Sequence, residues 1–253
     1  MKREHKKGFK VNLGDVVPVS TVEWYGKASM VIFLRGCPFR CPYCQNYAIL
    51  EGDNFVDIEY LEGQIKKAKN FIDAVVFSGG EPLMQPEQIK RLAGFTKMQS
   101  LLVGIETNGY YPEHLKELIG TKLVDKIFID VKAPLFSPKL YGKVTGADGK
   151  KAVTQVKKSL EICRDHNLEI RTTVFRGLIC DKNDIKAIAE EVSSYGKNIP
   201  YVLQQGRPEQ GRSEELKQYD APDRDELLEL GRMAKRYLRD VRIRTKEFGE
   251  ELI

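Results

Sequence analysis

Histidine, tryptophan and long apolar runs are scarce in this chain of 253 residues, which holds three His and one Trp. The longest apolar stretches, such as Met30 to Leu34, fall far short of the roughly 20 residues that a membrane-spanning helix needs. The first residues show no signal-peptide pattern, so we expect a cytoplasmic protein without a membrane segment. The hydrophobic content of 42% still suffices to bury a full core.

Charge of one sign is also in little excess. The formal net charge is +5, and residues 1–10 carry +4 of it, so the remaining chain is nearly neutral. Repeats, low-complexity tracts and Pro/Gly/Ser linkers are absent, and we therefore expect a basic tail over residues 1–10 and one domain over residues 11–253. Such a tail is typical of a solvated terminus, and contact with acidic protein or nucleic acid is the less favoured alternative.

Short runs rich in β-branched and aromatic residues alternate with longer segments of helical period. Strands that alternate with helices need right-handed crossovers, which produce a parallel sheet covered by helices. The pattern predicts an α/β fold of six such units, either a partial barrel or an open doubly wound sheet. The expected strands span residues 28–34, 74–77, 101–105, 126–131, 169–175 and 200–203, the helices 58–70, 86–98, 112–119, 151–167, 181–195 and 222–238, and an edge strand 241–244.

Cysteine occurs five times, and three of the five crowd into eight residues. An odd and clustered set does not suit a secreted disulfide framework, so metal ligation in a reducing compartment explains it better. Cys37, Cys41 and Cys44 follow the first expected strand in a CxxxCxxC arrangement. The glycine and prolines around them favour a turning loop over a helix.

Thiolates at this spacing suit zinc, copper(I) or an iron-sulfur cluster. The three His lie far away in sequence, so a structural zinc site lacks a nearby fourth ligand, although the fold could bring one across. Without it, three cysteines leave one iron of a four-iron cluster open to a small molecule. Cys163 and Cys180 are each expected to be a buried small hydrophobe.

Polar residues gather where the expected strands end. Binding sites in parallel sheets and α/β barrels lie at the carboxyl ends of the strands, so these clusters predict a single active site. The paired glycines after the second strand let backbone groups approach a ligand closely. The candidates, in strand order, are Gly79, Gly80 and Glu81, then Glu106 and Asn108, Asp130 and Lys132, Arg171, and Gln204.

The CxxxCxxC loop has an aromatic residue, Tyr43, just before its last cysteine, and in this it resembles the radical S-adenosylmethionine superfamily. The resemblance implies a partial (β/α)6 TIM-like barrel and a [4Fe-4S] cluster on Cys37, Cys41 and Cys44. It also implies that S-adenosylmethionine chelates the open iron through its amino and carboxylate groups. One electron then yields methionine and a 5′-deoxyadenosyl radical. The protein supplies position, so no catalytic acid or base is named.

The same resemblance implies which residues contact S-adenosylmethionine. Gly79, Gly80 and Glu81 are similar to the family's GGE motif, which meets the ligand's ammonium group. Asp130-Val131-Lys132 resembles a segment of pyruvate formate-lyase activating enzyme, which implies that Lys132 meets the carboxylate. The other implied contacts are Tyr43, Gln45, Glu106, Asn108, Asp130, Arg171 and Gln204.

Within the superfamily the chain resembles the small activating enzymes for glycyl radical proteins, in particular anaerobic ribonucleoside-triphosphate reductase activating proteins. This implies hydrogen abstraction from a glycine of a partner glycyl radical enzyme. The two remaining cysteines cannot hold a second cluster, so an external carrier such as ferredoxin or flavodoxin must supply the electron. Two departures are Gln45-Asn46, where many members have His-Asn, and Trp24-Tyr25-Gly26, where Trp-Pro-Gly is usual.

Two other functions compete with this one. An enzyme that modifies RNA or a small nucleotide with the same radical would suit the basic tail and a basic stripe on the last expected helix. A solvated helix face explains that stripe more simply. A structural zinc site in a binding module is the least favoured interpretation. The stripe consists of Arg232, Lys235, Arg236 and Arg239.

Overall fold

The computed structural model describes residues 9–253, so most of the expected basic tail over residues 1–10 lies outside the described residues. The described residues form two compact units. The first comprises residues 9–37, 48–105 and 117–125, and the second comprises residues 38–47, 106–116 and 126–253.

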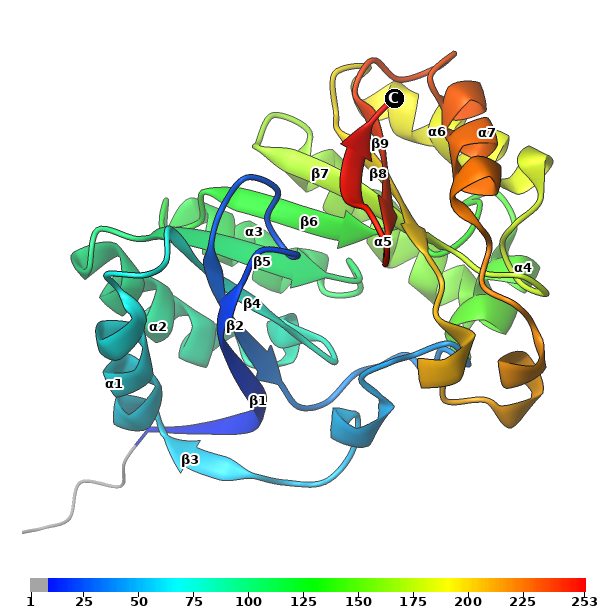
Figure 1. Ribbon diagram of the computed structural model, residues 1–253. Coiled ribbons are helices and arrows are strands. Elements are labelled where there is room, and N and C mark those ends of the chain that lie inside the picture. Colours follow the sequence, from blue (N-terminus) through cyan, green and yellow to red (C-terminus); the bar gives the residue numbers. More distant parts are fainter. Residues whose placement is uncertain (1–8) are drawn as a thin grey trace, which may run out of the picture. The chain divides into compact units, whose positions relative to one another are not determined.

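The sheet of the first unit consists of β1 (Lys10–Ser20), β2 (Ser29–Leu34), β3 (Phe55–Asp57), β4 (Ala74–Gly79) and the first residues of β5 (Leu102–Thr107). Their order across the sheet is β5-β4-β2-β1-β3 (Figure 1). β2, β4 and β5 are parallel, whereas β1 runs antiparallel to β2 and β3. β2 and β4 are almost wholly buried, as expected for parallel strands rich in β-branched and aromatic residues.

The sheet of the second unit consists of β6 (Lys126–Asp130), β7 (Leu168–Val174), β8 (Tyr201–Gln205), β9 (Val241–Thr245) and β10 (Gly249–Leu252). These strands lie side by side in chain order. β6 to β9 are parallel, and β10 is antiparallel to β9. The expected strand over 241–244 is therefore present, but the expectation that it forms an edge is wrong because β10 pairs with its outer side.

The helices are α1 (Ile58–Ala68), α2 (Pro86–Met98), α3 (Pro112–Gly120), α4 (Pro138–Thr145), α5 (Gly149–Cys163), α6 (Lys182–Tyr195) and α7 (Arg224–Ala234). An aspartate side chain accepts hydrogen bonds from backbone N–H groups at the start of α5, α6 and α7. Asp223 and Glu226 form a capping box at α7, which satisfies backbone N–H groups that the helix itself leaves unpaired. Within residues 9–253 no helix is long and apolar enough to cross a bilayer.

All six expected strand and helix pairs are present, with ends shifted by a few residues. The largest shifts, of four residues, are at the ends of α5, expected to reach residue 167, and of α7, expected to reach residue 238. Three-residue turns follow both helices, as in the bonds from His166 N to Cys163 O and from Arg236 N to Met233 O. β1, β3, β10 and α4 were not expected. β1 contains Gly14 and Pro18, which interrupt a strand pattern, and α4 has only eight residues.

The two cysteines outside the CxxxCxxC arrangement have different surroundings. Cys163 ends α5 and is fully buried, as expected, and burial raises the pKa of its thiol to about 12. Cys180 is exposed, so the expectation that it is buried is wrong. The chain leaves the bridge between Phe175 and Ile179 there and turns at the surface into the cap of α6.

The basic stripe is exposed, opposite the buried Leu227, Leu230 and Ala234. Only Arg232 of the stripe lies within α7 itself. These side chains therefore occupy a solvent-facing surface, as the simpler interpretation predicts.

Candidate functional site

Three of the expected site residues share one face of the sheet in the second unit. Asp130, the last residue of β6, is in register with Arg171 of β7. Arg171 is in register with Val202 of β8, two residues before Gln204. Paired residues on parallel strands point to the same face, and so do residues two apart on one strand. Asp130, Arg171 and Gln204 are therefore brought to a common face.

Lys132 lies two residues beyond the end of β6 and is fixed by Asp130. Its Nζ donates to Asp130 Oδ2 at 2.7 Å and lies 5.9 Å from the centre of the Tyr43 ring. Burial alone lowers the pKa of Lys132, but the Asp130 carboxylate outweighs it and holds the pKa well above its usual value. The ammonium group therefore stays charged and is suited to meet a carboxylate as a point charge.

Residues 38–47, which carry Cys41 and Cys44, are anchored in the second unit by backbone hydrogen bonds. Arg40 N donates to Thr145 O at 2.7 Å, at the end of α4. Ser213 N donates to Pro42 O at 2.8 Å. A turn closed by Cys44 N and Cys41 O at 3.1 Å sets the spacing of the two thiols.

The surroundings of Cys41 and Cys44 contain aromatic rings and several cations, of which Lys132 acts on both thiols, whereas Arg40 and Arg212 act on Cys44. The Tyr43 ring stacks on Phe175, with centroids 5.6 Å apart. Burial raises the pKa of the Cys41 thiol to about 11, against the opposing effect of Lys132. Burial raises the pKa of Cys44 as well. Burial therefore favours the neutral thiols, and the Lys132 ammonium group is what favours their anionic form as sulfur ligands.

In the first unit, Gly79 and Gly80 pack against the residues that lead into Cys37. A Cβ on Gly80 would stand 2.2 Å from Gly36 O, and Gly79 has a φ of +123°, which other residues rarely adopt. Glu81 N donates to Gly36 O at 2.7 Å. Only glycines allow this close approach, so the paired glycines of the sequence have a structural reason beside the ligand-binding one.

Some expected ligand contacts have local roles in turns. Glu81 is fully buried, and its Oε1 accepts from Leu83 N at 3.0 Å, which caps a short 3-10 turn. Asn108 Oδ1 accepts from Tyr110 N at 3.0 Å. Gln45 is exposed. The contacts of these residues with S-adenosylmethionine stay predictions.

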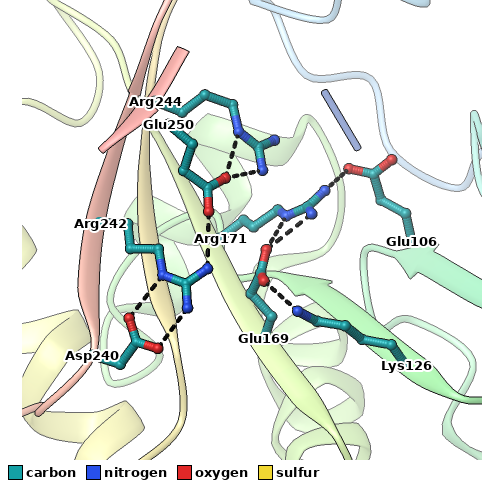
Figure 2. Close-up of polar contacts among 8 residues, drawn as sticks. All are labelled: Glu106, Lys126, Glu169, Arg171, Asp240, Arg242, Arg244 and Glu250. Carbon is teal, nitrogen blue, oxygen red and sulfur yellow. Dashed lines mark hydrogen bonds and ion pairs between the residues drawn. The ribbon is translucent and has the colours of Figure 1, made fainter. Parts of the chain in front are cut away.

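Arg171 is a fully buried member of an ion-pair network (Figure 2). Its Nη1 donates to Glu106 Oε1 at 2.7 Å, and its Nε donates to Glu169 Oε1 at 2.9 Å. Lys126 Nζ donates to the other oxygen of Glu169 at 2.7 Å. Sequence reasoning missed Lys126 and Glu169, although charged residues at alternate positions of otherwise apolar strands were a visible signal.

The donor set of the sequence fits a cluster bound by thiolates. Cys41 and Cys44 lie in the second unit with Lys132 as a nearby counter-charge, and Cys37 lies in the first unit beside the Gly80 backbone. Cysteine thiolates are the usual protein ligands of four-iron clusters. Within residues 9–253, however, no three His, Cys, Asp or Glu side chains form a group that could hold a metal ion, so the assignment of a cluster to these cysteines stays a prediction.

The chain is similar in sequence to known proteins. A family model described as Radical SAM superfamily matches residues 31–192. A Methanocaldococcus jannaschii protein, provisionally named a glycyl-radical enzyme activating enzyme, is 37% identical over 94% of this chain and 97% of its own length. The pyruvate formate-lyase-activating enzyme of Clostridium pasteurianum is 28% identical over 68% of this chain and 71% of its own.

A solved structure of TYW1 with a lysine-pyruvate adduct bound has a similar fold. The TM-score is 0.64 at 17% sequence identity, and the match covers 90% of this chain and 80% of that chain. At this identity the likeness shows a shared fold alone.

Proposed function

This chain belongs to the radical SAM superfamily, and on that premise we propose that it cleaves S-adenosylmethionine reductively to methionine and a 5′-deoxyadenosyl radical. It is an enzyme of the radical SAM type, and family membership implies S-adenosylmethionine and a [4Fe-4S] cluster as its cofactors. The assignment of these cofactors to particular residues of this chain is part of the proposal.

We assign the cluster to Cys37, Cys41 and Cys44, three thiolates that leave one iron for S-adenosylmethionine. When bound to these three thiolates, the cluster would supply the single electron needed for reductive cleavage of S-adenosylmethionine. The Tyr43 ring, stacked on Phe175, lies in the same buried surroundings as the Cys41 thiol, whereas Cys44 is half-exposed. Lys132 offsets part of the negative charge that accumulates there.

Lys132 is the proposed partner of the S-adenosylmethionine carboxylate, and Asp130 orients it through the 2.7 Å hydrogen bond. The proposed contact with the ammonium group is the Gly79-Gly80-Glu81 segment, where two glycines leave backbone atoms accessible at close range. We propose further contacts from Tyr43, Gln45, Glu106, Asn108 and Gln204, and we assign Arg171 to the same site through its hydrogen bond to Glu106.

The proposed substrate is a glycine of a partner glycyl radical enzyme, from which the radical removes a hydrogen atom. The names of two relatives support this choice, since both are activating enzymes. Cys163 and Cys180 cannot form a second cluster, so an external carrier such as ferredoxin or flavodoxin supplies the electron. Three cysteines clustered within eight residues suit a reducing compartment such as the cytoplasm.

The observation that carries the proposal is the pair of thiols, Cys41 and Cys44, held beside Tyr43 and Lys132. After anaerobic reconstitution with iron and sulfide, dithionite and S-adenosylmethionine should give 5′-deoxyadenosine. Cys41→Ala should abolish this release because it removes a ligand of the cluster. Cys163→Ala, the matched control, should retain most of it because that thiol lies at the buried end of α5.

Release of 5′-deoxyadenosine is measured by liquid chromatography against the wild type. Equal loss in both variants would show that the ligand set is misassigned. An absence of release from the reconstituted wild type would contradict the proposed cleavage.

A further inference from the structure

The network around Arg171 is fixed on several sides. Phe128 of β6 is in register with Glu169 of β7, so Lys126, Phe128, Glu169 and Arg171 share one face of the sheet. The Arg171 guanidinium lies 4.0 Å from the centre of the Phe128 ring, and Lys126 Nζ lies 5.0 Å from it. A planar guanidinium that stacks on a ring and bonds two carboxylates has little freedom to turn.

Burial decreases along this network toward one residue. The exposed fraction of the side chain is 0% for Glu169, 1% for Arg171, 10% for Lys126 and 19% for Glu106. Glu106, near the carboxyl end of β5, is therefore the member most accessible to a ligand. Glu169 and Arg171 are enclosed and can act on a ligand only through other residues.

The charges of the network support one another. Burial alone would raise the pKa of Glu169, but Arg171 and Lys126 outweigh it and hold the pKa below its usual value. Glu169 therefore stays ionised and keeps two acceptor oxygens, one for each cation. Arg171 also lies in register with Asp130, the carboxylate that binds Lys132.

Stability alone is a poor explanation for such a network. Buried ion pairs contribute little compared with well-packed apolar side chains of the same volume, because each charge loses its hydration. Their better attested effect is to fix one geometry among several. Here the geometry that they fix is that of the Glu106 carboxylate.

We propose that Glu169 and Lys126 are positioning residues that act through Arg171 to hold the Glu106 carboxylate in the orientation in which it contacts S-adenosylmethionine. The inference rests on the proposed function, and it gives Arg171 an indirect role in place of direct contact with the ligand.

The chain offers a matched control in a second network of the same unit (Figure 2). Glu250 of β10 accepts from Arg242 Nη1 at 3.1 Å and from Arg244 Nε at 3.0 Å. Its side chain is 5% exposed, so Glu250→Gln removes a buried carboxylate between two cations, much as Glu169→Gln does. Glu250 is not among the residues assigned to the ligand.

The test is a double-mutant cycle on the dissociation constant of S-adenosylmethionine, measured by anaerobic equilibrium dialysis of the reconstituted protein. Glu169→Gln should weaken binding about ten-fold, whereas Glu250→Gln should leave it unchanged. Glu106→Ala should weaken binding to a similar extent. Glu169→Gln added to Glu106→Ala should cost nothing more, because no carboxylate is left to position.

Lys126→Met is a milder variant that keeps the pair of Glu169 and Arg171 and only withdraws the second cation. It should weaken binding about three-fold, and this effect should also vanish in the Glu106→Ala background. It keeps the cycle measurable if Glu169→Gln does not fold.

Losses that multiply in the double variants would overturn the inference, because Glu169 or Lys126 would then act independently of Glu106. An equal loss in Glu250→Gln would also overturn it, because any buried charge would then have the same effect. In both cases the wild type still binds, and the proposed function stands. A reconstituted wild type that binds no S-adenosylmethionine would overturn the proposed function and this inference together.

Discussion

Among single side chains, Lys132 is the proposed partner of the ligand carboxylate. Its ammonium group donates a hydrogen bond to Asp130 and lies beside the Tyr43 ring. A charged hydrogen bond to the S-adenosylmethionine carboxylate contributes on the order of 1.5 to 3 kcal/mol. We therefore expect Lys132→Met to raise the dissociation constant roughly ten-fold to a hundred-fold, as measured by equilibrium dialysis. The absorbance of the reconstituted cluster should not change, because no cysteine is altered.

Lys97→Met is the matched control for this prediction. It also breaks a lysine–aspartate ion pair, since Lys97 Nζ lies 2.9 Å from both carboxylate oxygens of Asp125. Lys97 lies in the last turn of α2 and should not affect ligand binding. If Lys132→Met bound S-adenosylmethionine as tightly as Lys97→Met, the assignment of Lys132 would be wrong.

Residue types and spacing predict part of the site. The CxxxCxxC spacing with Tyr43 needs only local sequence to be recognised, because the family requires these residues at these intervals. The network around Arg171 could not be predicted in the same way. The hydrogen bond from Arg171 to Glu106 depends on the fold, and the one from Lys126 to Glu169 depends on strand register. Similarly, the exposure of Cys180 depends on a surface turn that no periodicity reveals.

At the scale of elements, β6 and β7 are joined by a buried salt bridge whose strength depends on pH. The pKa of Glu169 is held below 4.5, so its ionised form stabilises the folded chain at neutral pH. That contribution is lost as the pH falls below 4.5 and passes through the lowered pKa. We expect the free energy of unfolding of the wild type to approach that of Glu169→Gln over this range.

Urea denaturation of the metal-free protein at a series of pH values measures the difference between the two forms. It should be constant near neutral pH and then shrink by at most about 1.4 kcal/mol per pH unit in acid. Parallel loss of stability in both forms would show that Glu169 does not titrate with a lowered pKa.

The sequence predicts helices better than irregular strands. α2 begins at Pro86 and ends at Met98 as expected, because proline at the first helical position and an apolar periodicity define it locally. β10 was missed because its sequence, Gly-Glu-Glu-Leu over Gly249–Leu252, has no alternation of apolar and polar residues. In the structure all four residues are half-exposed or exposed. Its pairing with β9 depends on a turn and on the neighbouring strand, which single-sequence patterns do not contain.

For the molecule as a whole, the expected class of a partial (β/α)6 barrel of the radical SAM type agrees with the family match and with the fold shared with TYW1. Periodicity alone left an open doubly wound sheet as an alternative. The resemblance of the cysteine loop to the radical S-adenosylmethionine superfamily favoured the partial barrel over the open sheet, because that family has the partial barrel fold. The identity of the glycyl radical partner has no comparable local signature in the chain and stays a proposal.

Metal analysis of the whole protein tests most directly whether three cysteines hold a cluster with an open iron. After anaerobic reconstitution and removal of unbound metal, we expect about four iron and about four sulfide per chain, and Cys41→Ala should lose both. The control Cys163→Ala should match the wild type. A chain that retains about one zinc and no sulfide would contradict the cluster and, with it, the proposed cleavage of S-adenosylmethionine.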